Sequence, residues 1–129
     1  DIDDVVEVAA ERGIAALIIS NTTITRPALK SNKRGETGGL SGAPLKELAL
    51  QRLKDFRSAS GGHIPLIGVG GIATAEDAYE RIRAGASLIQ LYTAMIYEGP
   101  TIAASISCQL AKLLKRDGFN NVAEAVGTA

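Results

Sequence analysis

The sequence has few of the residues on which several classes of protein depend. It has no Trp, and aromatic residues make up only 4% of its 129 residues, so the core must be built from Ala, Leu, Ile and Val. A single cysteine, Cys108, excludes an internal disulfide framework. No apolar run approaches the roughly 20 residues that span a bilayer. What remains, 46% hydrophobic and 22% charged residues, is the composition of an ordinary globular domain.

The chain also carries no net charge at neutral pH. Fourteen basic residues balance fourteen acidic ones, so the chain as a whole has no electrostatic attraction for nucleic acid or for an anionic membrane surface. We therefore expect no nucleic-acid partner.

What the sequence does contain is an alternation of short apolar runs with amphipathic segments. Near-continuous apolar runs of strand length are typical of strands buried in parallel sheets. The strands are expected at 14–19, 63–69 and 87–91. The helices are expected at 1–12, 44–60, 74–84 and 100–115, with a short turn at about 121–126. The expected apolar face of the second helix consists of Leu45, Leu48, Ala49, Leu53 and Phe56.

This order of elements predicts parallel βαβ units with right-handed crossovers. Three parallel strands do not close on themselves, whereas a (β/α)8 barrel needs eight. We therefore expect the missing strands to come from an N-terminal half of the protein or, less simply, from another copy. The chain starts at Asp1 without Met and inside an expected helix, and we interpret it as part of a longer chain.

Parallel strands place their carboxyl ends on one side, where α/β proteins bind ligands. The polar residues 20–23, the pair Gly70-Gly71 and the pair Tyr92-Thr93 follow the three strands and must converge there. The connection at 24–43 is far longer than a usual βα loop, which favours a functional role.

The turn after the second strand is the most informative of these sites. Gly70-Gly71 is followed by Thr74, which is expected to cap a helix with Asp77 three residues later. Free backbone N–H groups and a helix dipole attract anions, so we predict a phosphate site here, with glycine allowing close backbone approach. The alternative is a tight turn without a ligand.

Four strings in this order resemble the C-terminal half of the dihydroorotate dehydrogenase family, FMN-containing (β/α)8 TIM barrels. They are Ser-Asn-Thr-Thr at 20–23, Glu-Thr-Gly-Gly-Leu-Ser-Gly at 36–42, Ile-Gly-Val-Gly-Gly-Ile at 67–72 and Ala-Gly-Ala-Ser-Leu-Ile-Gln-Leu-Tyr-Thr-Ala at 84–94. The run Leu-Tyr-Thr-Ala-x-x-Tyr-x-Gly-Pro at 91–100 is similar to class 2, the quinone-reducing enzymes; class 1 relatives tend to carry Gly instead of Tyr. The resemblance implies that residues 1–129 form the C-terminal portion of a single barrel domain, about its last three βα units.

The resemblance also implies roles for particular residues. Asn21 and Thr22 fall on positions that hold the orotate or dihydroorotate ring. The family often has Thr where Ser20 stands, and the hydroxyl is kept. The positions implied to contact FMN are Ser20, Gly42, Gly70, Gly71, Tyr92 and Thr93.

The implied activity is oxidation of dihydroorotate to orotate in pyrimidine biosynthesis, with FMN and then a quinone as acceptors. The family's serine base, the lysine beside the flavin and a glycine-rich flavin contact correspond to positions before Asp1. No catalytic residue and no metal ligand is therefore assigned in this chain, and the segment alone is expected to be soluble and inactive. Its peripheral attachment to the bacterial or mitochondrial inner membrane is implied to occur only through a helical extension before Asp1.

Two other functions stay open at this point: a self-associating half-barrel that binds a phosphate-containing ligand, and another phosphate-binding barrel enzyme that shares only the glycine turn. For several residues the simpler interpretation is structural. Ser41 suits a loop or cap, His63 and Tyr79 suit packing, Cys108 is expected to be inert, and Tyr92 suits either the core or a flavin contact. The loop residues Arg26, Lys30, Lys33 and Arg34 are expected to be solvated.

Overall fold

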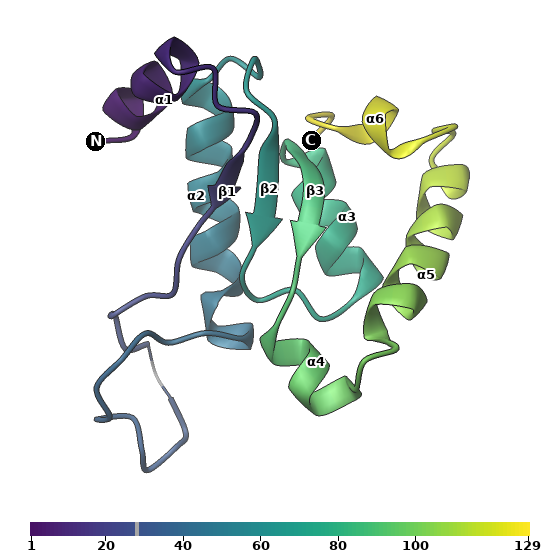
Figure 1. The fold of residues 1–129 in the computed structure, drawn as a ribbon. Helices are drawn as coiled ribbons and strands as arrows, with labels where there is room; N and C mark the ends of the chain where they lie inside the picture. The colour runs from purple at the N-terminus through teal and green to yellow at the C-terminus, as the bar shows by residue number, and fades with distance from the viewer. Residues whose placement is uncertain (28) are drawn as a thin grey trace.

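The computed structural model describes residues 1–27 and 29–129, in which three parallel strands form one sheet (Figure 1). The strands are β1 (Leu17–Ile19), β2 (Leu66–Val69) and β3 (Ala86–Gln90), in the order β1-β2-β3. Ile18 pairs with Ile67, and Gly68 pairs with Ile89. The predicted set of parallel βαβ units is confirmed. β1 and β2 each begin three residues later than expected, at Leu17 and Leu66. β3 has the expected length but begins one residue earlier, at Ala86.

Two helices cover one face of this sheet (Figure 1). α2 (Lys46–Ala59), which follows a 3-10 turn η1 (Ala43–Leu45), and α3 (Ala75–Arg83) lie behind the strands in Figure 1. α5 (Ile102–Arg116) packs on α3. The remaining helices are α1 (Ile2–Glu11), α4 (Thr93–Glu98) and α6 (Val122–Ala125). Both ends of the chain lie near the amino ends of the strands, and α4 lies at the carboxyl ends (Figure 1).

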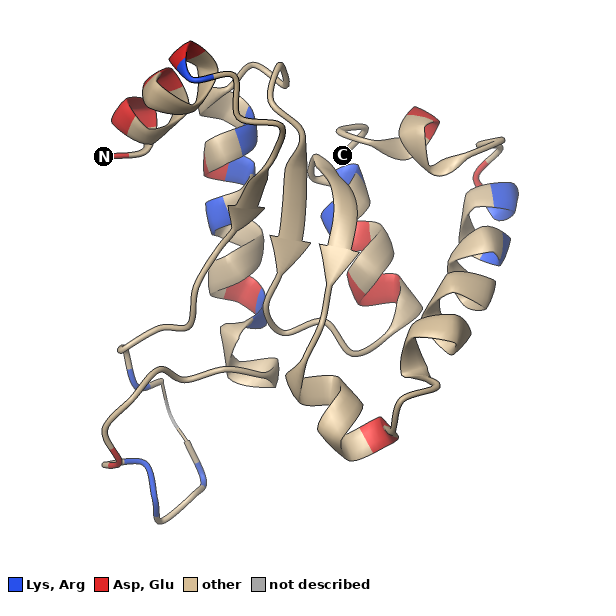
Figure 2. Cartoon of the chain, in the orientation of Figure 1, with Lys and Arg blue, Asp and Glu red and all other residues tan. Residues whose placement is uncertain are grey.

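The sheet buries one face and exposes the other. Side chains alternate along a strand, and Ile19, Leu66 and Ala86 are buried with Leu53 and Phe56 of α2. On the opposite face Ile18 is 53% exposed and Leu88 is 62% exposed. Figure 2 shows no charged residue on any strand. An uncharged, apolar and uncovered face is the kind of surface that a closed barrel buries in its interior.

Two details of the helices differ from expectation. Helix α4 was not predicted, because it is only six residues long and has no side-chain cap. The expected apolar face of α2 placed Leu48 inside, but Leu48 is 44% exposed and Leu50 is buried. Leu48 and Leu50 flank the buried Ala49 on either side of the helix, and Leu50 is the one that packs in a cluster with Ile19 of β1.

The predicted capping box of α3 is confirmed. The Thr74 hydroxyl accepts a hydrogen bond from the Asp77 N–H at 3.1 Å, and Asp77 Oδ2 accepts from the N–H groups of Ala73 and Thr74 at 3.0 Å each. Lys46 Nζ of α2 lies 2.5 Å from Asp77 Oδ1. Burial opposes ionisation of this carboxyl, but the bonds from Lys46, Ala73 and Thr74 outweigh it and lower the pKa of Asp77 below 3.8. Asp77 therefore joins α2, the turn and α3.

Replacing Asp77 with Asn should lower the free energy of unfolding by about 1–3 kcal/mol at neutral pH, because a cap and a charged partner are lost. The folded-state pKa is depressed, so this stabilisation is present above the ordinary value of 3.8 and disappears as the pH falls through the folded-state pKa. Urea unfolding at pH 7 and at about pH 3 measures the difference. Asp55→Asn is the control, because Asp55 is a half-buried carboxylate of α2 that also pairs with a cation, Arg52, but caps no helix. A deficit for Asp77→Asn that is equally large in acid would contradict the assignment.

Candidate functional site

A cleft of about 600 Å³ lies at the carboxyl ends of the strands, within the range of small-molecule sites. It is formed by the residues after β1, the segment before η1, the β2–α3 turn and the start of α4. All the residues predicted to bind cofactor or substrate line it: Ser20, Asn21, Thr22, Gly42, Gly70, Gly71, Tyr92 and Thr93. The structure thus brings the predicted site residues together, and their individual roles stay predictions.

The two glycines of the β2–α3 turn face the start of α2 at very short range. A Cβ on Gly71 would lie 2.5 Å from Lys46 Cα and 2.6 Å from Lys46 N, and one on Gly70 would lie 2.9 Å from Leu45 Cδ2. Both glycines also have positive φ, 103° at Gly70 and 71° at Gly71. These glycines therefore have a reason that is independent of any ligand: a side chain would collide with the Lys46 backbone at Gly71 and with the Leu45 side chain at Gly70. Close approach of a ligand to this turn stays a prediction.

Fewer backbone N–H groups are free to bind an anion than the sequence indicated. The first turn of α3 is closed by Asp77, which takes the N–H groups of Ala73 and Thr74. Within the described part of the chain, no hydrogen bond uses the N–H of Gly71 or Ile72, and both residues line the cleft. A phosphate at this turn would accordingly meet the Gly71-Ile72 backbone rather than the end of the helix.

Arg81 lies beneath the turn and was not identified from the sequence. Its side chain is 1% exposed, and its Nη2 donates to the carbonyl oxygens of Lys46 at 2.5 Å and Gly70 at 3.1 Å. Among the described residues, its Nε and Nη1 have no hydrogen-bond partner. Burial lowers the pKa of Arg81. The available signal was its place on the inward face of α3, one turn after Asp77.

The opposite wall of the cleft is held by Thr93. Its hydroxyl donates to Ser41 Oγ at 3.1 Å, and a Cβ on Gly42 would lie 3.0 Å from Thr93 Cγ2. The segment before η1 thus packs directly on the start of α4, which agrees with a loop role for Ser41. Tyr92 is 70% exposed, so the interpretation of Tyr92 as a core residue is wrong.

The residues after β1 are positioned by the long loop. Asn21 Oδ1 accepts from the Thr22 N–H at 2.8 Å, and the neighbouring Thr23 forms an antiparallel bridge with Leu40. Gly39 packs directly against the Thr22 side chain. The loop therefore folds back over the proposed substrate residues.

Arg26 ties this loop together from within. Its Nη2 donates to the carbonyl oxygens of Glu36 at 3.0 Å and Gly38 at 2.6 Å. Although Arg26 is exposed, as expected, its guanidinium is used in the loop, whereas Lys30, Lys33 and Arg34 are exposed to solvent.

The other singled-out residues lie outside the cleft. His63 Nδ1 lies 3.1 Å from the Ser60 carbonyl oxygen, and Cys108 is exposed on α5. Tyr79 is buried, and its hydroxyl donates to Asp117 at 2.7 Å. These contacts agree with structural roles for His63 and Tyr79.

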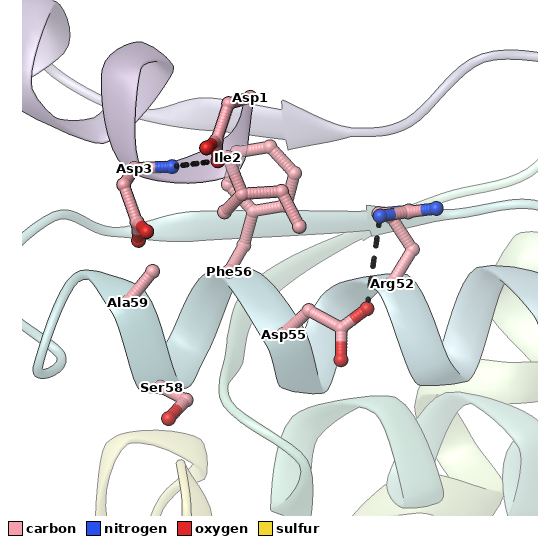
Figure 3. Close-up of a pocket in the computed structure, with 8 residues that line it drawn as sticks. All are labelled: Asp1, Ile2, Asp3, Arg52, Asp55, Phe56, Ser58 and Ala59. Carbon is pink, nitrogen blue, oxygen red and sulfur yellow. Dashed lines mark hydrogen bonds and ion pairs between the residues drawn. The ribbon is translucent and has the colours of Figure 1, made fainter.

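A second hollow, of about 800 Å³, lies between the start of α1 and the end of α2 (Figure 3). Its polar groups pair with one another, since Asp1 accepts from the Asp3 N–H and Arg52 lies 3.7 Å from Asp55. It lies at the amino ends of the strands, away from every predicted site residue. Among the described residues, no group of three His, Cys, Asp or Glu side chains could hold a metal ion.

Comparison with known proteins decides the family. The sequence profile described as dihydroorotate dehydrogenase matches residues 1–114. The chain belongs to the dihydroorotate dehydrogenase family. Members of this family are generally flavin-dependent.

Several similar proteins are quinone-type enzymes by name. Dihydroorotate dehydrogenase (quinone) of Novosphingobium aromaticivorans is 64% identical over 128 residues, which cover 99% of this chain and 37% of the relative. The mitochondrial dihydroorotate dehydrogenase (quinone) of Mus musculus is 49% identical over 98% of this chain and 32% of its own length. The chain thus spans about a third of the length of the relatives it matches.

Solved structures give the same result for the fold. The ligand-free dihydroorotate dehydrogenase of Eimeria tenella superimposes with a TM-score of 0.93 at 44% identity, covering 98% of this chain and 36% of that one. The prediction of part of a (β/α)8 barrel is confirmed.

Replacing Gly71 with Ala should destabilise the chain by clearly more than replacing Gly99 with Ala. Both glycines have positive φ, 71° and 86°, but nothing lies within 4 Å of a Cβ on Gly99. Gly99→Ala should therefore show the backbone cost alone, about 1 kcal/mol, and Gly71→Ala should add the collision with Lys46, about 1–3 kcal/mol more. Urea unfolding of both variants measures this, and equal losses would show that α2 moves aside freely.

Proposed function

We propose that this chain is the C-terminal part of a quinone-dependent dihydroorotate dehydrogenase, a single FMN-binding barrel domain that oxidises dihydroorotate to orotate in pyrimidine biosynthesis. The observation that carries the proposal is the gathering of the predicted flavin and substrate residues around one cleft in a chain of this family. FMN would supply the hydride acceptor and pass the electrons on to the quinone. The residues of this chain would bind and orient both molecules.

The cofactor side of the cleft fits a phosphate ester. The unused N–H groups of Gly71 and Ile72 are donors for an anion, and the Ser20 and Thr93 hydroxyls lie on the same cleft. Gly42 and Tyr92 complete the proposed contacts around these donors. We assign FMN retention to this group of residues.

The substrate side fits the carbonyl groups of the dihydroorotate ring. Asn21 Oδ1 is already engaged by the Thr22 N–H, which leaves the Asn21 amide as a donor of two N–H groups. Thr22 adds a hydroxyl that donates to Asn21 Oδ1 at 3.4 Å, beside Gly39, where a side chain would collide with it. These groups would fix the ring in position, while the catalytic base is proposed to lie outside this chain.

Membrane association is proposed on the same basis, through segments outside this chain, at the cytoplasmic side of a bacterial inner membrane or at the mitochondrial inner membrane. Among the described residues, no helix is long and apolar enough to cross a membrane.

A graft tests the proposed function directly. This chain would replace the matched 37% of the Novosphingobium aromaticivorans relative, to which it is 64% identical. The purified graft should be yellow, with bound flavin and dye reduction that depends on dihydroorotate, as in the unmodified relative. A folded but colourless graft would contradict the proposal, and a monodisperse oligomer of the chain alone that binds phosphate would favour the self-associating half-barrel, whose interface would be the apolar face around Ile18 and Leu88.

Replacing Asn21 with Ala in this graft should lower kcat/KM for dihydroorotate by about tenfold to a hundredfold, because a polar contact with the substrate is lost. Flavin content should not change. Asn120→Ala is the matched control. Among the described residues, the Asn120 side chain bonds Glu124 and does not line the cleft. Loss of flavin with unchanged substrate kinetics would show that Asn21 belongs to the cofactor side.

A further inference from the structure

Arg81 is a buried cation without a carboxylate partner. No Asp or Glu among the described residues lies within ion-pair distance of its guanidinium, and the nearest acid on its helix face, Asp77, is paired with Lys46. Burying an unpaired charge is costly, and only two carbonyl oxygens, those of Lys46 and Gly70, compensate it. A buried positive charge at this point needs a reason beyond packing.

The geometry of one peptide bond supplies that reason. In a trans peptide the C=O and the following N–H point in opposite directions. Arg81 holds the Gly70 carbonyl on the side of α3. The Gly71 N–H is thereby directed away from Arg81, on the side where Gly71 lines the cleft and where no described residue accepts its hydrogen bond.

The same contact strengthens that donor. A charged group bonded to a carbonyl polarises the peptide, and chains of hydrogen bonds reinforce one another where the dielectric is low. The positive charge itself also lies one peptide from the cleft, buried and therefore little screened by salt.

We propose that Arg81 is a positioning residue for the phosphate group of the cofactor, acting through the Gly70-Gly71 peptide without touching the ligand. This inference rests on the proposed function, because it assumes that the cleft takes a phosphate monoester dianion. It predicts that Arg81 contributes to the binding of FMN and contributes nothing to the binding of riboflavin, which has the same ring system and no phosphate.

The experiment measures dissociation constants of FMN and riboflavin for the apo form of the graft by flavin fluorescence. Arg81→Met removes the charge at similar length, and Arg81→Lys keeps the charge with fewer donors. The matched control is Arg83→Met, which removes the same charge two residues later on α3, where the side chain bonds Thr128 instead. The urea midpoint of each variant is recorded beside the binding data.

Arg81→Met should weaken FMN binding by about tenfold to a hundredfold, the range expected if the released Gly70-Gly71 peptide turns and the phosphate loses its hydrogen bond from the Gly71 N–H. Riboflavin binding should not change. Arg81→Lys should weaken FMN binding by about three- to tenfold, which keeps the test decisive if the Met variant does not fold. Arg83→Met should change neither constant by more than about twofold.

Two results overturn the inference in distinguishable ways. If both flavins lose affinity equally in the Arg81 variants, or if neither changes, Arg81 has only a structural role and the proposed cofactor site stands. If the graft with Arg81 intact already binds FMN no more tightly than riboflavin, the phosphate site itself is wrong, and the proposed function fails with it.

Discussion

The architecture of the cleft depends on how closely the β2–α3 turn approaches the first turn of α2. At Gly71 the two backbones are so near that even a methyl group would overlap Lys46. Two side chains of α3 maintain this approach. Arg81 joins the carbonyls of Gly70 and Lys46, and Asp77 pairs with the Lys46 side chain. The residues before α2, including Ser41 and Gly42, are thereby placed against Thr93, so the two walls of the cleft have a common origin.

Two solvent-accessible cations near this contact are already bonded to other groups of the protein. Lys46, the cation at the start of α2 beside the glycine turn, is paired with Asp77 of the α3 capping box. Arg26 of the basic loop is likewise used, on the carbonyls of Glu36 and Gly38. The cation with unused hydrogen-bonding capacity next to the turn is the one that is buried, Arg81. Its influence on an anion must therefore pass through the backbone.

The sequence predicted well those features that depend on neighbouring residues or on strand direction. The Thr74-Asp77 cap is local, and parallel strands oblige Asn21, Gly71 and Thr93 to meet whatever the details of packing. It predicted poorly what depends on the distance between elements remote in sequence. The reason for Gly71 lies 25 positions earlier, at Lys46, and the reason for Arg81 lies in the carbonyls that happen to converge on it. The burial of Leu50 instead of Leu48 similarly depends on a remote element, because Leu50 packs in the same cluster as Ile19 of β1.

The proposed phosphate-binding and ring-binding residues come from different parts of the chain, and the topology explains why. The proposed phosphate donors of Gly71, Ile72 and Thr93 follow β2 and β3, which are joined by a short crossover through α3. Ser20 and Gly42 add contacts from the end of β1 and from the segment before η1. The ring side is built on the end of β1 and a long loop that returns to Leu40, and its far wall must come from outside this sheet because the face bearing Ile18 and Leu88 is uncovered. Under the proposed function, the residues that bind the phosphate are therefore structurally separate from those that complete the reactive part of the site. A change that loosens the Gly70-Gly71 turn should lower the affinity for the cofactor. A change in the packing against the uncovered face should instead alter the orientation of the ring for reaction.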